Sequence, residues 1–249
     1  MKSIYTVLIL ILSLVAFSSC TEDEDAPSAA SEITTEEAAE IVGTSLASSS
    51  AGLTEVSTEV AETSEEVATD VDFDPCGAQA DTSYSISSSS GAAISYTGEL
   101  SYSYAISCEN DDPQTFSYEV SYSSSFDAPR MASSNSGSSS LSLVKLSSDY
   151  KIFEINGSDS RSGSFESKIF NKTSSDASVS FGLTDLVVDL NAKSITGGTA
   201  TYTLLGTTAT GNTYSINGNV VFNGDGTATI AIQGENFSLD LKTGDILGI

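Results

Sequence analysis

The residues in this chain that could take part in chemistry are mainly carboxylates and hydroxyls. The 249-residue chain contains 34 acidic residues, 9 Lys or Arg and no His. The absence of His excludes Ser–His and Cys–His nucleophile pairs. It also means that the chain lacks the commonest transition-metal ligand. Ser142 and Lys145 have the S-x-x-K spacing of serine acylating enzymes, which needs both residues on one helical turn. The segment alternates like a strand, which would place them on opposite faces, so we expect a protein without catalytic residues.

The carboxylates suggest few specific sites. With 34 acids some pair will fall at any chosen distance, so a glycosidase-type pair of carboxyls is not a specific signal. Calcium prefers oxygen ligands, and its main candidate site is Glu109, Asp111 and Asp112, clustered with Asn110. The turn at 223–225 is a weaker candidate, because its glycines already explain it as a hairpin. A solvated acidic loop is the simpler interpretation, and no cofactor is indicated.

Tyrosines recur on segments that alternate between apolar and polar residues. The positions that could face a ligand are Tyr96, Tyr102, Tyr104, Tyr118 and Tyr122. They could line a groove for a glycan, although the chain has no Trp. The favoured interpretation is that the rings form core and the hydroxyls reach its rim.

The first residues have the pattern of a secretory signal. Lys2 is followed by an apolar run at 4–17, which is too short to span a bilayer and fits the h-region of a signal peptide. The small residues Ser18 and Ser19 then precede Cys20. We expect residues 1–19 to be a signal peptide.

The segment Phe17-Ser18-Ser19-Cys20 resembles the lipobox of bacterial lipoproteins, with Phe17 where Leu is usual. That resemblance implies cleavage before Cys20 and its acylation with chains such as palmitate. The alternative is an ordinary cleaved signal followed by an incidental cysteine.

The acidic cluster Glu22, Asp23, Glu24 and Asp25 follows Cys20 directly. It resembles the surface-export signal of lipoproteins from Bacteroidetes. The resemblance implies an outer-membrane protein that is exposed on the cell surface and held by its lipid. The alternative is that the cluster is only a solvated spacer.

The net charge excludes some classes of partner, and the two remaining cysteines suggest a disulfide. A formal net charge of −25 repels nucleic acid and anionic lipid headgroups, so we expect no nucleic-acid partner. Once Cys20 is assigned to lipid, Cys76 and Cys108 remain as an even pair in an oxidising compartment. This favours a disulfide between them over two free thiols.

The segment before Cys76 is predicted to contain a tether and two helices. Residues 20–31 are acidic and rich in small residues, as in a flexible tether, and 32–72 are predicted to form a helical hairpin. Thr34 and Glu37 have the spacing of a capping box at the first helix. The second helix has an apolar stripe formed by Leu53, Val56, Val60, Val67 and Val71.

Residues 76–249 are predicted to form an antiparallel β domain. Apolar and polar residues alternate around the tyrosines, while 132–140 is low in complexity and is predicted to be a loose loop. A strand starting at Tyr150 is predicted to end in a hairpin at Asn156-Gly157, and Gly197-Gly198 to mark another turn. Further strands are expected at 162–170, 177–183, 185–191, 195–205, 212–222, 227–233 and 236–241. The predicted fold class is mainly β, a large antiparallel meander shaped as an open barrel or a sandwich, with the N-terminal helical hairpin covering one side.

These features predict a non-enzymatic, lipid-anchored surface protein that acts as an interaction or structural module. The alternative is a lipoprotein that binds a glycan through the tyrosine-bearing strands or an apolar ligand in an open-barrel cavity. The partner beyond the membrane, whether protein or glycan, is not identified by the sequence.

Overall fold

The computed structural model describes residues 33–248. Cys20, the acidic cluster at 22–25 and the predicted signal peptide therefore lie outside the described residues. Within 33–248, no helix is both long enough and apolar enough to cross a membrane.

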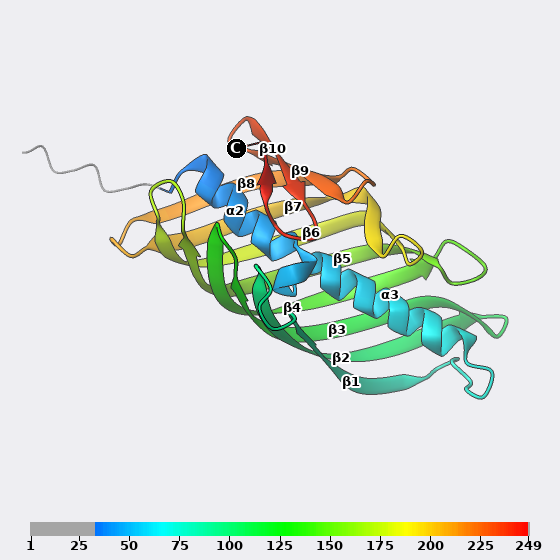
Figure 1. Cartoon of the computed structure of the whole chain (residues 1–249). Coiled ribbons are helices and arrows are strands. Elements are labelled where there is room, and N and C mark those ends of the chain that lie inside the picture. The colour runs from blue at the N-terminus through cyan, green and yellow to red at the C-terminus, as the bar shows by residue number, and fades with distance from the viewer. Residues whose placement is uncertain (1–32, 249) are drawn as a thin grey trace, which may run out of the picture. The chain divides into compact units, whose positions relative to one another are not determined.

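The fold is a single antiparallel sheet whose strands follow one another in chain order, β1 to β11. The strands are β1 (Gln79–Ser87), β2 (Ser95–Glu109), β3 (Asp112–Asp127), β4 (Met131–Lys145), β5 (Ile152–Ser167), β6 (Ser174–Asp189), β7 (Ser194–Thr208), β8 (Thr213–Phe222), β9 (Thr227–Ile232), β10 (Glu235–Asp240) and β11 (Ile246–Leu247). The sheet is strongly curved (Figure 1). It is also open, because β1 and β11 are not paired with each other. The predicted antiparallel meander is confirmed. A sandwich of two sheets is not what forms.

Two helices cover the concave side of the sheet, which we call the inner face; the opposite side is the outer face. α2 (Thr35–Leu46) begins at the predicted capping box, in which Thr34 and Glu37 cap each other's backbone N–H groups. A short 3-10 turn, η1 (Ser48–Ser50), separates it from α3 (Leu53–Thr69). The helices follow one another end to end across the inner face rather than side by side (Figure 1).

Polar contacts fix α2 on the sheet. The carboxylate of Glu37 accepts hydrogen bonds from the backbone N–H of Thr173 at 3.1 Å and from its hydroxyl at 2.9 Å. Glu40 is buried and pairs with Arg130 at 2.7 Å. Each buried charge on α2 therefore has a partner from the loops that flank the sheet.

The core lies between the helices and the inner face. The most buried apolar residues include Ala38, Val42, Leu46, Leu53, Val56, Val60, Leu100, Phe116, Leu143, Phe153, Ile155, Val179, Leu186, Val188, Ile195, Leu204, Val220, Ile230 and Leu239, each 0% exposed. Burying one of the Val, Leu, Ile or Phe side chains in this list contributes roughly 1.5–3 kcal/mol. Because this core is built wholly from described residues, 33–248 form a unit with its own core. Val71, which was predicted to belong to the stripe of α3, is instead 94% exposed, because the helix ends at Thr69.

The segment 132–140, which was predicted to be a loose loop, lies inside β4 and pairs on both sides. That prediction was wrong because the strand is specified by its neighbours, and not by its own composition. Gly137 lies opposite Tyr122 of β3, and a Cβ at Gly137 would approach the tyrosine hydroxyl oxygen to 2.4 Å. The same arrangement pairs Tyr202 with Gly218, so the glycines make room for tyrosine rings on the neighbouring strand.

Two predicted turns lie at register shifts within long strands. Asn156-Gly157 lies inside β5 where the register with β6 shifts, and Gly157 has a φ of 146°. Gly197-Gly198 lies inside β7 opposite a shift that contains Asp185. The Asn156 side chain accepts a hydrogen bond from the Asp185 N–H at 2.9 Å, so a side chain of β5 pairs with the irregular segment of β6. An irregularity such as a bulge bends a strand without ending it, which explains why 177–183 and 185–191 form one strand, β6.

Candidate functional site

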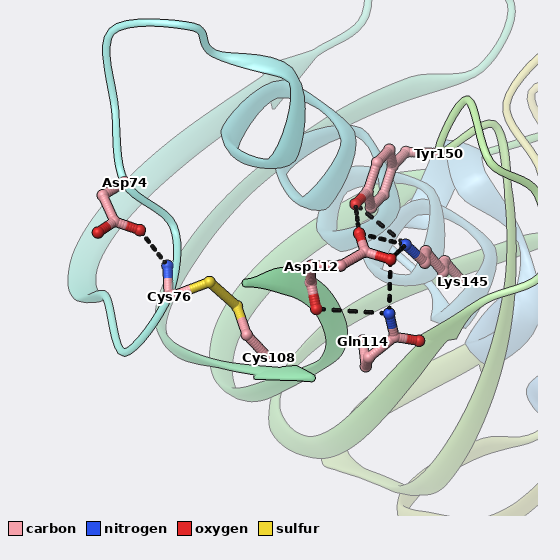
Figure 2. The surroundings of a disulfide bond; sticks show 7 residues. All are labelled: Asp74, Cys76, Cys108, Asp112, Gln114, Lys145 and Tyr150. Atoms are coloured by element: carbon pink, nitrogen blue, oxygen red, sulfur yellow. Dashed lines mark hydrogen bonds and ion pairs between the residues drawn. A yellow bond between two sulfur atoms is a disulfide. The ribbon is translucent and has the colours of Figure 1, made fainter. Parts of the chain in front are cut away.

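The Ser142–Lys145 pair is not assembled into a site. Ser142 is exposed on the outer face of β4, whereas Lys145 turns to the other side at the end of the strand. The Lys145 ammonium contacts the Asp112 carboxylate at 2.5 Å and the Tyr150 hydroxyl at 3.2 Å (Figure 2). Tyr150 also donates to Asp112 at 2.7 Å, so this cluster joins the β2–β3 turn to the β4–β5 loop.

The candidate calcium residues form a tight turn. Asn110 and Asp111 have φ values of 54° and 63°, which are the conformation of a two-residue hairpin turn favoured by Asn and Asp. Hydrogen bonds from Lys145, and then from Tyr150, hold the pKa of Asp112 below its usual range. Among residues 33–248, no group of three or more acidic or cysteine side chains is arranged to hold a metal ion.

The disulfide between Cys76 and Cys108 is present, with Cα atoms 5.5 Å apart. It joins the loop that precedes β1 to the end of β2, and Asp74 accepts a hydrogen bond from the Cys76 N–H at 3.0 Å (Figure 2). Next to it, Gly77 donates to the Ile106 carbonyl at 3.2 Å. The bond thus fixes the junction between the helices and the sheet, as predicted.

The candidate tyrosines lie on the inner-face side of β2 and β3, because they share the parity of the buried residues of these strands. Tyr102, Tyr118 and Tyr122 are buried, and Tyr96 and Tyr104 are half-buried. Ring planes meet at 59° for Tyr102 and Tyr118, and at 41° for Tyr104 and Tyr118. Sugar-stacking surfaces need exposed, roughly coplanar rings, which this arrangement does not offer.

The tyrosine hydroxyls anchor α3 to the sheet. The Tyr118 hydroxyl lies 2.9 Å from the Ser64 hydroxyl, and the Tyr102 hydroxyl lies 2.7 Å from that of Thr63. Tyr102 also donates to Glu59 at 3.2 Å. Burial raises the pKa of Tyr102 to about 12, so it stays neutral and can act as a donor at any physiological pH.

A buried polar cluster, not predicted from the sequence, lies at the centre of the inner face. It contains Asp159 and Arg161 of β5 together with Tyr122 and Ser139, and both charged residues are at most 2% exposed. Asp159 accepts from the Tyr122 hydroxyl at 2.8 Å and from the Ser139 hydroxyl at 2.7 Å. Burial raises the pKa of Asp159, and Arg161 opposes this shift.

Arg161 connects this cluster to the helices. Its Nη2 donates to the carbonyl of Ala51 at 2.8 Å, and its guanidinium carbon lies 4.8 Å from the Tyr122 ring centroid. Ala51 is the left-handed residue at the break between η1 and α3, with φ of 53°. The sequence contained one signal for this cluster. Asp159 and Arg161 are odd-numbered, like the apolar Phe153, Ile155 and Phe165, and alternate residues of a strand share one face of the sheet.

The side of α3 that faces away from the core carries a row of carboxylates, Glu55, Glu59, Glu62 and Glu66, at helical spacing. Lys193, from the β6–β7 turn, lies 3.4 Å from Glu62. Burial, and then repulsion from Glu59 and Glu62, raise the pKa of Glu55 to about 7. Repulsion between these carboxylates destabilises α3 whenever they are ionised.

Replacing Glu55 by glutamine is expected to stabilise the protein above pH 7 and to have little effect near pH 4. The folded state holds the Glu55 proton more tightly than the unfolded state, because its pKa is raised from 4.5 to about 7. Ionisation of Glu55, which faces Glu59, Glu62, Lys193 and Tyr84, therefore costs stability as the pH rises through this window. With allowance for solvent screening, the cost is on the order of 1 kcal/mol, measurable by urea denaturation at each pH.

Glu66→Gln is the matched control, because Glu66 is the exposed end of the same row. An equal gain from both substitutions would show that general charge reduction, and not the buried position of Glu55, is responsible.

The outer face carries rows of hydroxyl and amide side chains that run across the strands in register. One row consists of Ser83, Ser101, Ser121, Ser138, Ser160, Ser180, Thr203 and Asn217. Adjacent members are about 4.8 Å apart, the spacing between strands. A shallow depression of about 720 Å³ lies on this face, and Ser103, Ser117, Ser140 and Ser142 line part of it.

Comparisons with protein-family models, with curated proteins and with solved structures found no match.

Proposed function

We propose that this protein is a non-enzymatic surface lipoprotein that acts as an interaction or structural module. Cys20 would carry the lipid, residues 20–31 would form the tether, and the described unit would be displayed outside the outer membrane. The main support for the proposal is the outer face of the sheet, which carries a broad, exposed, in-register array of hydroxyl and amide side chains from β1 to β8.

The acidic charge also supports a role at a surface. A net charge of −25 repels anionic lipid headgroups, so the folded unit would stand away from the membrane. Neutral hydroxyl rows, which are rich in donors and acceptors, then offer the face on which polar contacts cost the least desolvation.

The alternative is a lipoprotein that carries an apolar ligand or binds a glycan. An apolar ligand on the inner face would have to displace the chain's own helices, where Val42, Leu53 and Val56 are fully buried. A glycan would meet tyrosines that are covered or tilted. The outer-face interaction module is therefore the better-supported function.

Lipid anchoring at Cys20 is tested by expressing the full chain and its Cys20→Ala variant in a bacterium with lipoprotein processing. We expect mass spectrometry to find an acylated peptide that begins at Cys20, and the Cys20→Ala variant to leave the membrane fraction. A variant with Ala at 22–25 serves as the matched comparison and should remain acylated while losing protease accessibility on intact cells. Membrane retention of Cys20→Ala would contradict the anchor.

The interaction role is tested on residues 21–249, which include the complete core. A screen against cell-surface glycans, fatty acids and envelope proteins should find binding that is weakened by Ser→Lys changes on the outer face. Saturable fatty-acid binding that opens the inner face would support the alternative instead.

A further inference from the structure

The first strand, β1, is an exposed edge of the sheet. It pairs with β2 on one side, and β11 at the opposite end of the sheet is a strand of only two residues (Figure 1). β1 is therefore the one long free edge within residues 33–248. Nearly every residue of β1 is exposed, including the Tyr84 ring at 38%.

The hydrogen bonds to β2 determine which backbone groups of β1 are free. Ser88 donates to the Tyr96 carbonyl at 2.9 Å, and the Ala78 carbonyl accepts from Ile106 at 3.1 Å. In an antiparallel pair, hydrogen-bonded and non-hydrogen-bonded residue pairs alternate along the strands. The backbone N–H and C=O groups of the even-numbered residues of β1 therefore bond to β2, and those of the odd-numbered residues point away from β2, toward the open edge. The outward N–H and C=O groups belong to Gln79, Asp81, Ser83, Ser85 and Ser87.

β1 lacks the features that usually block an edge from pairing. It contains no proline, lysine or arginine, and its register with β2 has no bulge. Asp81 is its only charged residue and lies on the outer face with the serines. Such an edge can accept another extended strand by backbone hydrogen bonding.

We infer that two copies of this chain associate through β1, antiparallel, about a two-fold axis at Ser83. With Ser83 opposite the same residue of the second copy, Asp81 lies opposite Ser85 and Gln79 lies opposite Ser87. All of the outward-pointing residues then occupy hydrogen-bonded pairs, so each free donor meets an acceptor.

Side chains at this register are compatible on both faces. On the outer face the charge of Asp81 meets Ser85, and the two Asp81 residues are offset along the strands. On the inner face Tyr84 lies opposite Thr82 of the second copy, and Ile86 lies opposite Ala80. This pairing covers the Tyr84 ring, which is exposed in the single chain. The two sheets become one continuous sheet, and the hydroxyl row through Ser83 and Ser101 continues into the second copy.

The net charge of −25 opposes this association over long distances. Salt screens charges that are more than about 8–10 Å apart, whereas the backbone hydrogen bonds are unaffected. We therefore expect dimerisation to strengthen as the salt concentration rises, the opposite of an association driven by charge attraction. This inference does not depend on the lipid anchor or on the proposed function, since it concerns the described unit alone.

The decisive experiment is sedimentation equilibrium of residues 21–249 across a dilution series, with Ser83→Lys and Ser101→Lys as matched variants. Both replace an exposed serine in the same outer-face row, but only Ser83→Lys places like charges directly opposite at the two-fold axis. We expect the unmodified chain and Ser101→Lys to dimerise, and Ser83→Lys to lose the dimer. A monomeric unmodified chain, or equal behaviour of the two variants, would overturn the inference.

Mixtures of two variants test the register of the β1–β1 pair, and they also show whether each variant is folded. Ser83→Glu alone should also be monomeric, whereas an equimolar mixture with Ser83→Lys should form a heterodimer, because opposite charges then face each other. Ser83→Cys should form a disulfide-linked dimer under mild oxidation, since Cα atoms in a hydrogen-bonded pair lie about 5.5 Å apart, and Ser101→Cys should not. Mixtures that remain monomeric, or crosslinking at Ser101, would rule out this two-fold axis.

Discussion

Replacing Arg161 by alanine is expected to lower the free energy of unfolding by about 3–5 kcal/mol, the cost of breaking a buried charged network. The substitution removes the hydrogen bond to the Ala51 carbonyl and the cation–π contact with Tyr122. It also removes the positive charge that opposes the effect of burial on Asp159. Urea denaturation monitored by tyrosine fluorescence measures the loss.

The position of Arg161 explains why the effect is large. Ala51 lies where η1 ends and α3 begins, so the bond from Arg161 joins the helix break to β5, in the interior of the sheet. Without it, the Ala51 carbonyl remains buried and unpaired while α3 loses an attachment between its start and the sheet. Both effects destabilise the folded state.

Lys168→Ala is the matched control, since Lys168 pairs with Asp127 at the surface and its side chain is 33% exposed. An exposed pair contributes at most about 1 kcal/mol. Asp159→Asn introduced into the Arg161→Ala variant should recover part of the loss, because the unpaired buried carboxylate is then gone. A loss of under about 1 kcal/mol for Arg161→Ala would contradict a structural role for the cluster.

The sequence predicted those parts of the fold that depend on local patterns. Thr34 and Glu37 form the capping box, and the alternation around Tyr102 and Tyr118 places these rings on the inner face. The pairing of Cys76 with Cys108 followed from the number of cysteines and the expected compartment. In each case the signal lies within a few residues or is carried by a residue type with few partners.

The parts that were missed depend on contacts between distant residues. The serine-rich stretch at 132–140 has little strand preference of its own and is ordered by β3 and β5 on either side. Asn156-Gly157 has the chemistry of a turn, but a register shift with β6 allows the strand to continue. The buried cluster draws on Ala51, Tyr122 and Arg161, which no local window brings together.

Removing the disulfide by a Cys76→Ala, Cys108→Ala double substitution is expected to lower the free energy of unfolding by roughly 3.7 kcal/mol. The bond closes a loop with a sequence separation of 32 residues, which contains β1 and most of β2. An unfolded chain without this constraint gains conformational entropy, so the unfolded state becomes more favourable.

The structure also predicts where the double variant loosens. β1 pairs only with β2, and the hydrogen bonds of Gly77 and Ala78 to Ile106 lie next to the disulfide. Hydrogen exchange should therefore speed up in β1 while the amides of β5 and β6, which pair on both sides, stay protected. Because the inferred dimer forms through β1, the double variant should also dimerise more weakly.

Reductant supplies the control for this prediction. It should lower the denaturation midpoint of the unmodified chain to that of the double variant and leave the double variant unchanged. The same midpoint for the oxidised chain and the double variant would mean that loop closure does not stabilise this fold. Uniformly faster exchange through β5 and β6 would mean that the disulfide supports the whole sheet, and not the edge that it joins to α3.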